Sequence, residues 1–297
     1  MSKTSLIVGM NIGNLYKDVY TEMGFNVVTV DTDPTKNADY TNLVQACEAN
    51  PNLRTVHICT PNYTHEVIAQ TIFEATLTVD VMFVEKPGLA TPQAWNKLVQ
   101  GNRATRIMMV KNNMWRHNMT ALGEAAASAD KVTIHWINQN RIPSPGSWFT
   151  DRSKAFGGVS RDLMPHLLSF YMSMNPGWAD TTITAKASEQ RHILNEVFTT
   201  DYGTVHPDGV YDVDDYAMLV LNDKWHLVAD WASGTHEDIR IEFIYNNKPN
   251  TDFGFGLCPV HAYKHMIEHA LLLLPADNFW KSQYAMDMFI HERISLL

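Results

Sequence analysis

The first part of the chain alternates short apolar runs with stretches of helical periodicity. The apolar runs end near Val30, Cys59, Val84 and Val110. The helical patterns begin near Leu15, Glu66 and Thr91–Pro92. Continuous apolar runs are typical of parallel strands that are buried on both faces, and strands that alternate with helices predict a doubly wound parallel sheet.

The pattern changes near residue 115. One strongly helical segment, from about Asp162 to Met174, lies among β-prone runs at Val132–Ile137, Ile183–Ala187, Ala217–Leu221, Trp225–Trp231 and Ile239–Tyr245. Asn222-Asp223 has the composition of a hairpin turn. We therefore predict a second, α+β domain with a largely antiparallel open sheet. The predicted domains are residues 1–115 and 116–297, with the active site between them and two final helices (about 259–274 and 279–294) packing back across both.

Composition excludes several classes of protein. The chain is 45% hydrophobic and 19% charged, as in ordinary soluble globular proteins. A net charge of −9 argues against sequence-independent binding to nucleic acid. No apolar run approaches the roughly 20 residues of a membrane span. The three cysteines fit no disulfide framework or metal spacing, and the first strand leaves no room for a signal peptide, so we expect a reducing, cytoplasmic location.

The start of the chain has the pattern of a dinucleotide-binding βαβ unit. A strand leads into a glycine turn from Gly9 to Gly13, and the second strand ends in Asp31. Backbone N–H groups and the helix dipole at such a turn hold a pyrophosphate, and the acidic residue binds a ribose hydroxyl. The turn is one residue short and Asn11 stands near the second glycine, so an ordinary strand-to-helix turn is the alternative. Asp31 favours NAD over NADP, because a carboxylate repels a 2′-phosphate; NADP remains open.

Two further strand ends carry polar residues. One is followed by Thr60, Pro61, Asn62 and His65, and the other by Glu85, Lys86 and Pro87. Ligands of open α/β sheets bind beyond the carboxyl ends of the strands, so we expect Lys86 to meet a ligand. Taken alone, a Lys-Pro pair is more often a turn, and a histidine such as His65 more often caps or packs.

Together these segments resemble the Gfo/Idh/MocA oxidoreductase family, the glucose–fructose oxidoreductase and inositol dehydrogenase group. The matching pieces are the glycine turn, TPNYTH, EKP, and the segment GGVSRDLMPH from Gly157 to His166, in family order over roughly the first 170 residues. The combination is specific, although no single piece is. The resemblance implies an N-terminal Rossmann domain and a C-terminal domain for substrate binding and oligomerisation, in a homodimer or homotetramer.

The resemblance also implies roles for individual residues. The cofactor-binding positions it implies are Gly9, Asn11, Ile12, Gly13, Asp31, Thr60, Pro61, Asn62, His65, Glu85 and Lys86. The catalytic positions it implies are Lys86, Asp162 and His166. The Lys–Pro bond of EKP is often cis in the family. Arg116 matches the family's basic residue after the fifth strand.

The chemistry of these side chains agrees with that assignment. Oxidising a carbinol removes a hydroxyl proton while a hydride leaves the same carbon. An imidazole titrates near neutrality, so His166 suits the role of base. Asp162 stands four residues earlier, on the same face of a helix, where it would stabilise the imidazolium or orient a hydroxyl. Lys86 would polarise the reacting oxygen. For Asp162 and His166 alone, a helix-surface pair is the alternative.

A turn-rich loop at residues 140–152 precedes this segment. It is a candidate substrate lid, with a plain connector as the alternative. Trp148, Arg116 and Arg161 are candidates for contact with a sugar ring or an acidic substituent of the substrate, although every tryptophan here is also a packing candidate.

Histidines recur every fourth residue near the C-terminus, at His261, His265 and His269. Adjacent helical turns can chelate a metal. Three histidines in line do not all reach one ion comfortably, and HExxH is absent, so a polar helix face is the favoured interpretation and no metal is predicted.

The sequence thus predicts an NAD(P)-dependent oxidoreductase. It would move a hydride between a nicotinamide cofactor and a carbinol or carbonyl of a sugar, sugar derivative or cyclitol. One alternative is a tightly bound NAD used for transient oxidation in a lyase or glycosidase cycle. Another is a non-catalytic NAD-binding sensor. We expect no nucleic-acid or membrane partner.

Overall fold

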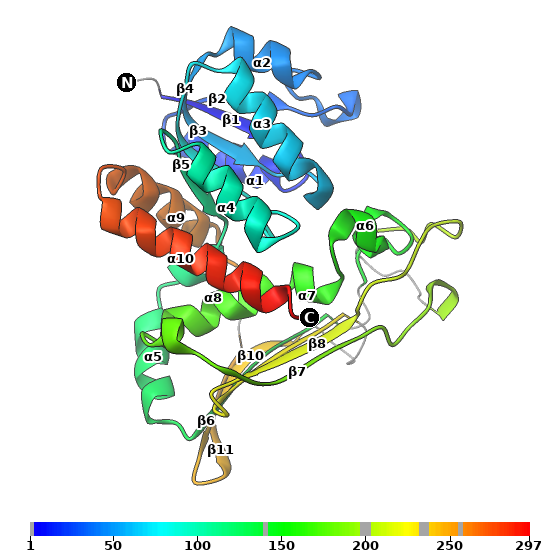
Figure 1. Ribbon diagram of the computed structural model, residues 1–297, viewed down its shortest axis with the longest axis vertical. Helices are drawn as coiled ribbons and strands as arrows, with labels where there is room; N and C mark the ends of the chain where they lie inside the picture. Colours follow the sequence, from blue (N-terminus) through cyan, green and yellow to red (C-terminus); the bar gives the residue numbers. More distant parts are fainter. Residues whose placement is uncertain (1–2, 139–141, 197–202, 232–237, 255–257) are drawn as a thin grey trace. The chain divides into compact units, whose positions relative to one another are not determined.

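The computed structural model describes residues 3–138, 142–196, 203–231, 238–254 and 258–297 (Figure 1). Its contacts divide the chain into two units. The first contains Met1–Val110 and Tyr263–His291, and the second contains Lys111–Ala262 and Glu292–Leu297. The predicted second domain contains all residues after 115, whereas the contacts group residues 263–291, most of the two C-terminal helices, with the first unit.

The first unit is built on a five-stranded parallel sheet in the order β2-β1-β3-β4-β5. Its strands are β1 (Thr4–Val8), β2 (Asn26–Val30), β3 (Asn52–Ile58), β4 (Thr78–Val84) and β5 (Arg106–Met109). Its helices are α1 (Gly13–Glu22), α2 (Leu43–Ala49), α3 (His65–Ala75), α4 (Pro92–Gly101) and most of α9 (Val260–Leu272) and α10 (Asp277–Ile294). The doubly wound parallel sheet expected from the sequence is confirmed.

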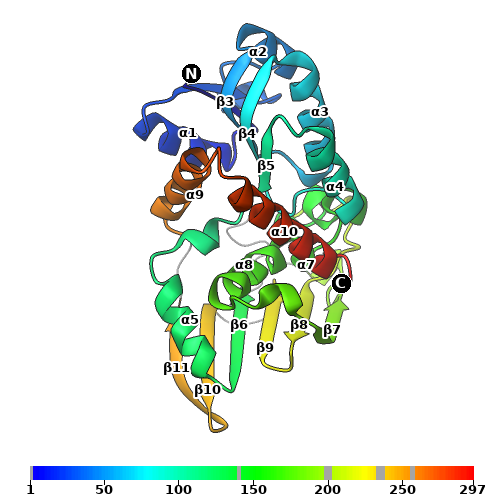
Figure 2. The same ribbon diagram turned by 60° about the vertical axis from the view of Figure 1, so that its left-hand side comes forward.

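Helices cover both faces of this sheet. α1 lies on one face, and α2, α3 and α4 lie on the other (Figure 2). This explains why the last four residues of β4, Val81–Val84, are fully buried and uniformly apolar. The start of α4 follows local rules: Thr91 Oγ1 accepts a hydrogen bond from the Ala94 N–H at 3.1 Å, and Pro92 fills the first helical position.

The second unit contains a six-stranded sheet within the described residues, in the order β11-β10-β6-β9-β8-β7. Its strands are β6 (Lys131–Ile137), β7 (Ile183–Glu189), β8 (Tyr216–Leu221), β9 (Trp225–Asp230), β10 (Asp238–Tyr245) and β11 (Lys248–Gly254). Its helices are α5 (Met119–Ser128), α6 (Arg152–Ala155), α7 (Val159–Asp162) and α8 (Met164–Met174). The β6·β9 pair is parallel and the other pairs are antiparallel, as expected for a largely antiparallel sheet.

Two hairpins shape this sheet. Asn222 and Asp223 join β8 to β9 with φ values of 51° and 55°, and positive φ at both central residues is what a type I′ turn requires. This turn was predicted. Asn246 and Asn247 make the same turn between β10 and β11, with φ values of 51° and 60°. The sequence analysis did not predict β11, which forms an edge of the sheet.

The helical segment predicted from Asp162 to Met174 is divided in the structure. α7 ends at Asp162 and α8 begins at Met164. Pro165 has no backbone N–H to continue the helical ladder, and the His166 N–H bonds the Leu163 carbonyl at 3.0 Å, three residues back. Asp162 and His166 therefore lie on either side of a helix junction, and the prediction of one continuous helix was wrong.

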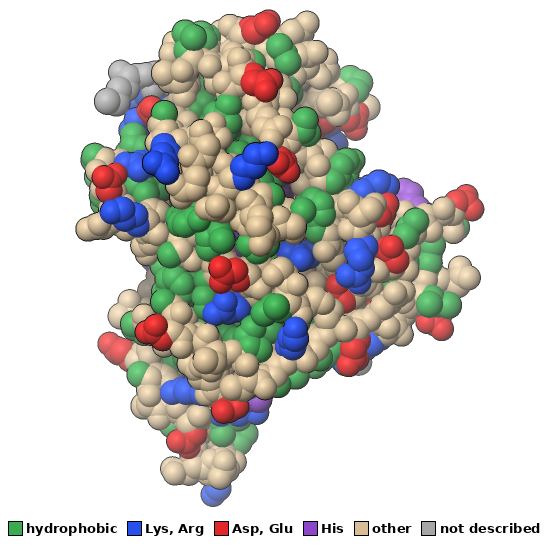
Figure 3. Space-filling view, viewed as in Figure 1, with side chains coloured by type: hydrophobic (Ala, Val, Ile, Leu, Met, Phe, Trp, Pro, Cys, Tyr) green, Lys and Arg blue, Asp and Glu red, His purple; other side chains and the backbone are tan. Residues whose placement is uncertain are grey.

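The surface carries charges of both signs, and the three cysteines form no disulfide. On the face drawn in Figure 3, lysine and arginine side chains are interspersed with carboxylates. Among the described residues, no helix has the length and apolar character needed to cross a membrane. Cys47, Cys59 and Cys258 are free thiols, and burial raises the pKa of Cys47 and of Cys258 to about 11.

Candidate active site

The glycine turn after β1 is held closely against the end of β3. Gly9 has a φ of 91°, and its N–H donates to the Val30 carbonyl at 2.8 Å. A Cβ at this position would lie 2.7 Å from the carbonyl oxygen of Cys59. Both the left-handed backbone and the close approach require glycine here. The fold of the turn itself therefore explains the glycine at position 9.

Helix α1 begins directly after this turn with an uncapped N-terminus. Its N-cap residue is Ile12, which makes no side-chain capping bond in the described part of the chain, and its first turn has no acidic residue. Gly13 is buried, whereas Asn11 and Ile12 are exposed. Unsatisfied N–H groups and the positive end of the helix dipole form a site for an anion, so this end of α1 fits a pyrophosphate.

Asp31 lies beside the same turn. Its Oδ2 accepts a hydrogen bond from the Met10 N–H at 2.8 Å, and its Oδ1 accepts one from the Asp33 N–H at 2.9 Å. These bonds fix the carboxylate at the end of β2, where the sequence analysis expected a ribose contact. Lys36, which the sequence analysis did not single out, reaches this region and donates from Nζ to Asn11 Oδ1 at 2.7 Å.

His65 is fully buried and connects two strand ends. Its Nδ1 lies 2.7 Å from the Gly88 carbonyl oxygen and its Nε2 lies 2.8 Å from the Thr60 carbonyl oxygen. Burial lowers the pKa of His65, although both carbonyls favour the protonated ring. The side chain therefore ties the Thr60–Pro61–Asn62 turn to the turn that follows Lys86. These contacts fit a packing and capping role for His65, which is the alternative to a catalytic one.

Glu85 anchors the EKP turn through two hydrogen bonds. Tyr16 donates a hydrogen bond to Glu85 Oε1 at 2.6 Å, and the Lys86 N–H donates to Glu85 Oε2 at 3.2 Å. Burial raises the pKa of Glu85, while the Tyr16 hydroxyl and the Lys86 charge act in the opposite direction. The Lys86–Pro87 bond is cis, as the resemblance implied. Glu85 thus holds the turn that carries Lys86.

In the second unit, His166 contacts the segment that follows β5. Its Nδ1 lies 3.1 Å from Asn113 Nδ2, and its ring lies 5.3 Å from that of Trp136, between centroids. Arg116 is buried. Its Nε donates to Asn113 Oδ1 at 2.9 Å, and its guanidinium lies 5.4 Å above the centre of the Phe170 ring. Arg116 therefore holds Asn113, which in turn contacts His166. The predicted contact of Arg116 with the substrate stays a prediction.

Asp214, which lies in the buried segment before β8, binds the start of α7. Its carboxylate accepts hydrogen bonds from the N–H groups of Gly158 (2.9 Å) and Ser160 (2.8 Å) and from the Ser160 hydroxyl (3.0 Å). Its carbonyl accepts the Val159 N–H at 2.9 Å. A Cβ on Gly158 would lie 1.8 Å from that carbonyl oxygen, so the second glycine of the motif is needed for this contact. Asp214 is an N-terminal cap supplied from a distant part of the chain.

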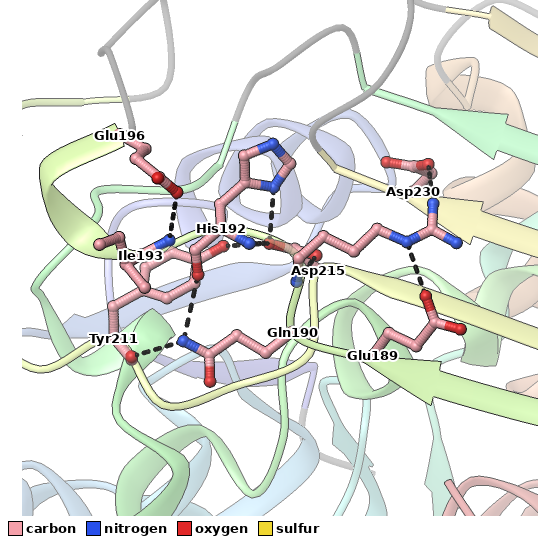
Figure 4. A network of polar contacts seen from close by, with 9 residues as sticks. Glu189, Gln190, His192, Ile193, Glu196, Tyr211, Asp215 and Asp230 are labelled. Atoms are coloured by element: carbon pink, nitrogen blue, oxygen red, sulfur yellow. Dashed lines mark hydrogen bonds and ion pairs between the residues drawn. The ribbon is translucent and has the colours of Figure 1, made fainter.

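The neighbouring Asp215 binds the segment after β7. Its carboxylate accepts hydrogen bonds from the N–H of Arg191, from the N–H and Nδ1 of His192, and from the Tyr211 hydroxyl, at 2.8–3.0 Å (Figure 4). Its carbonyl accepts the Trp231 N–H at 2.9 Å. The Asp214–Asp215 pair therefore joins α7, the chain after β7 and the end of β9.

The other predicted substrate contacts lie near α6 and α7. Trp148 stacks on Phe149, with ring centroids 3.9 Å apart. Arg161 is largely enclosed, and burial lowers its pKa while the nearby Asp214 opposes that shift. Residues 140 and 141 of the predicted lid loop lie outside the described residues. The lid and both substrate contacts stay predictions.

The row of histidines on α9 is engaged locally. His261 stacks on His117, with centroids 4.0 Å apart, and His269 Nδ1 lies 2.9 Å from the His265 carbonyl. Within the described residues, no group of three or more histidine, cysteine or acidic residues is arranged to hold a metal.

The predicted site residues thus form two groups. One lies in the first unit, at the carboxyl ends of β1 to β4, and contains the glycine turn, Asp31, His65 and Lys86. The other lies in the second unit and contains Asp162 and His166. Their convergence on one ligand stays a prediction. Supporting residues such as Asp214 belong to no sequence motif, and the Gly158 N–H that Asp214 binds is 56 positions away.

A family model matches most of the first unit. Residues 19–111 match the sequence model described as "Oxidoreductase family, NAD-binding Rossmann fold" (GFO_IDH_MocA). A putative UDP-kanosamine synthase oxidoreductase subunit of Amycolatopsis mediterranei (strain S699) is 28% identical over 252 residues, covering 77% of this chain and 69% of that protein.

Solved structures match the fold of nearly the whole chain. GenD2 from gentamicin A biosynthesis, in complex with NAD, has a TM-score of 0.71 at 17% identity and covers 97% of this chain and 91% of its own. Levoglucosan dehydrogenase, in complex with NADH and levoglucosan, has a TM-score of 0.67 at 15% identity, covering 100% and 96%. The UDP-N-acetylglucosamine 3-dehydrogenase GnnA from Acidithiobacillus ferrooxidans also has a TM-score of 0.67 at 15% identity, covering 100% and 96%. These TM-scores show a shared fold.

Residues 19–111, which contain Asp31 and the EKP turn, match the NAD-binding Rossmann domain of the Gfo/Idh/MocA family of oxidoreductases, and the parallel sheet of the first unit agrees with that match.

Proposed function

We propose that the protein is a nicotinamide-dependent dehydrogenase or reductase that acts on a CH–OH group of a sugar, sugar derivative or cyclitol. The observation that carries the proposal is the Rossmann unit of an oxidoreductase family whose glycine turn ends at an uncapped helix, with a carboxylate fixed at the next strand end. That arrangement suits a dinucleotide, and a bound nicotinamide supplies the hydride acceptor or donor.

The proposed cofactor contacts follow the geometry of the first unit. The N-terminus of α1, with Gly9, Asn11, Ile12 and Gly13, would hold the pyrophosphate. Asp31 would accept a ribose hydroxyl. Thr60, Pro61, Asn62, Glu85 and Lys86 would border the nicotinamide half, with His65 acting through the two turns that it joins.

The proposed chemistry uses one group from each unit. In oxidation, the C–H bond of the carbinol breaks and its electron pair leaves with the hydride, while the hydroxyl proton passes to a base and a C=O bond forms. His166 is the proposed acid–base group at the substrate oxygen, Lys86 stabilises negative charge on that oxygen, and Asp162 orients the substrate or the imidazole. Arg116, Trp148 and Arg161 are the proposed contacts to the rest of the substrate.

NAD is the cofactor of choice in this proposal. A carboxylate at Asp31 accepts a ribose hydroxyl well and repels a 2′-phosphate. Lys36, which bonds Asn11, is a cation near the same place and would attract a 2′-phosphate. NADP is therefore kept as the second, weaker candidate.

The relatives suggest the class of substrate. Proteins that match this chain in sequence or fold include a UDP-kanosamine synthase oxidoreductase subunit, levoglucosan dehydrogenase and a UDP-N-acetylglucosamine 3-dehydrogenase. All three names point to carbohydrate chemistry. A sugar, free or attached to a nucleotide, is therefore the substrate we propose.

Assembly and location are further parts of the proposal. Residues 116–297 would bind substrate and mediate a homodimer or homotetramer, with no nucleic acid or membrane as partner. The face of the second sheet opposite α8 carries half-buried His135, Val228 and Met218 side by side on three paired strands, which suits contact between copies. Three free thiols suit a cytoplasmic location.

The test is a substrate screen. Purified protein would be mixed with NAD or NADP and with myo-inositol, levoglucosan, hexoses, hexose phosphates, UDP-glucose or UDP-N-acetylglucosamine, and nicotinamide absorbance would be followed. The proposal expects reduced cofactor to accumulate in step with oxidised sugar. A lyase or glycosidase would instead release product without net cofactor reduction. A sensor would bind NADH, detected by its fluorescence, and turn over none of these compounds.

A further inference from the structure

Asn113 lies between a cation and the imidazole proposed as the acid–base group. It is fully buried. Its Oδ1 accepts a hydrogen bond from Arg116 Nε at 2.9 Å, and its Nδ2 lies 3.1 Å from His166 Nδ1. All three residues belong to the second unit, so the arrangement does not depend on the first.

The Arg116 bond fixes the direction of the Asn113 carboxamide. An arginine side chain has donors and no acceptor, so the atom of Asn113 that faces Nε must be the oxygen. The nitrogen of the carboxamide then faces His166. Turning the carboxamide by 180° would place two N–H donors against each other at Arg116 and would remove an acceptor from a buried guanidinium, which is costly.

The fixed carboxamide determines which ring nitrogen of His166 carries the proton. An amide nitrogen only donates, so His166 Nδ1 must offer its lone pair. A neutral imidazole has one N–H, which then lies on Nε2. We infer that Asn113 is a positioning residue that holds neutral His166 in its Nε2–H form. The position of this proton follows from the contacts alone, and only its consequence for catalysis rests on the proposed function.

That proton position changes how His166 meets a substrate. In its Nε2–H form the ring donates a hydrogen bond, and it fits the acceptor oxygen of a carbonyl substrate. To accept a hydroxyl proton at Nε2, the ring must first become the Nδ1–H form, and this requires the Asn113 carboxamide to turn. The structure therefore describes a state that suits the keto form of a sugar, and the role of base requires a rearrangement of Asn113.

The decisive experiment reads the tautomer directly. Full-length protein with ¹⁵N-labelled histidine would be studied by long-range ¹H–¹⁵N NMR above the pH at which its histidines are protonated, with His166→Gln to identify the His166 signals. The wild type should show the Nε2–H form at His166. Asn113→Asp, which replaces the amide donor by an acceptor of the same shape, should show the Nδ1–H form.

The matched control is Asn112→Asp, which adds a carboxylate one position away, at another buried asparagine. It should leave His166 in the Nε2–H form. An Nδ1–H form in the wild type, or no difference between the wild type and Asn113→Asp, would overturn the inference. These readings need no substrate, so they stand even if the screen of sugars finds no turnover.

Activity supplies a second readout on any sugar that the screen identifies. In the reduction of a keto sugar by NADH, Asn113→Ala should lower kcat by about 10²-fold or more, within the range that a correctly placed acid–base group contributes, while NADH binding stays unchanged. In that direction Asn113→Asp should retain more activity than Asn113→Ala and move the alkaline limb of the kcat/KM profile to higher pH, because its carboxylate favours a protonated ring. A merely structural role predicts equal losses and an unmoved profile, and that result would overturn the inference.

Discussion

The indole N–H of Trp231 donates a hydrogen bond to Asp162 Oδ2 at 3.0 Å. This contact joins the last residue of α7 to the residue that follows β9. The backbone N–H of Trp231 is itself bonded to Asp215, next to the Asp214 that caps the other end of α7. Both ends of this short helix are therefore held by the same part of the second sheet, which explains how a four-residue helix keeps a defined direction.

Replacing Trp231 by phenylalanine should weaken catalysis more than folding. Phenylalanine keeps an aromatic ring at this buried position but has no N–H to bond the Asp162 carboxylate. Because a hydrogen bond to a charged group contributes about 1.5–3 kcal/mol, we expect kcat to fall by about tenfold or more. Trp280→Phe is the control, since it removes an indole bond to the Leu273 carbonyl in the first unit. Similar kcat values for the two variants would count against a positioned Asp162.

Asp214→Asn should loosen the start of α7. The N–H groups of Gly158 and Ser160 bond different oxygens of Asp214, and the amide replaces one of these acceptors by a donor. Hydrogen–deuterium exchange measured by mass spectrometry should become at least about tenfold faster in the peptide that covers residues 157–162, because a difference of about 1.4 kcal/mol in local opening is tenfold.

Asp208→Asn makes the same change at an exposed position of the same loop and should leave that exchange unchanged. Equal exchange rates in wild type and Asp214→Asn would show that the cap does not determine the order of α7.

Local patterns in the sequence were enough to predict most elements of the fold. Four apolar runs correspond to β2, β3, β4 and β5, and the Asn222-Asp223 turn was predicted from its composition. These features depend on residues close together in the chain. The buried face of α3 required the structure: the sheet contacts the side that carries His65, Ala69 and Ile72, and Val67 is 57% exposed.

Features that depend on distant partners were not predictable in the same way. β11 contains Pro249 and several polar residues, and it becomes a strand by pairing with β10 at the sheet edge. Nothing in the sequence distinguishes Asp214 from other acidic residues, and only the fold brings it into contact with Gly158. Asn113 belongs to none of the quoted motifs, and its contact with His166 spans 53 positions. The candidate residues were found from motifs, and their supports required the structure.

Asp31→Ser should change the choice of cofactor. Removing the carboxylate removes the repulsion of a 2′-phosphate and a partner of the ribose, and Lys36 is close enough to the turn to favour the added phosphate. We expect NAD affinity to fall and NADP affinity to rise, each by about tenfold, in fluorescence titrations with the reduced cofactors. Asp33→Ser removes a carboxylate that bonds Thr35 and should leave the preference unchanged. An unaltered preference in Asp31→Ser would place the ribose elsewhere.

His57 should make the first unit sensitive to acid. Its ring is 1% exposed, lies 4.1 Å from the Tyr16 ring and 4.3 Å from the Phe83 ring between centroids, and has no hydrogen-bond partner among the described residues. Burial lowers the pKa of His57 well below its ordinary value. The unfolded chain therefore binds a proton first, and the stability present above about pH 6.5 is lost as the pH falls, by about 1.4 kcal/mol per pH unit.

Urea unfolding at pH 7.5 and pH 5.5 would measure this loss. His57→Phe should reduce the difference between the two midpoints, whereas His269→Gln, at an exposed position, should not. The same pH dependence in wild type and His57→Phe would assign the acid sensitivity to other groups.

The central claim is that a hydride passes between a sugar carbon and the nicotinamide, with Lys86 and His166 at the reacting oxygen. The most direct measurement is transfer of deuterium from a sugar labelled at its reacting carbon, followed by mass spectrometry of the NADH formed. We predict one deuterium in each NADH, and a rate that falls by about 10²-fold or more in His166→Ala and in Lys86→Met while NADH binding persists. Unlabelled NADH, or wild-type rates in both variants, would contradict the account.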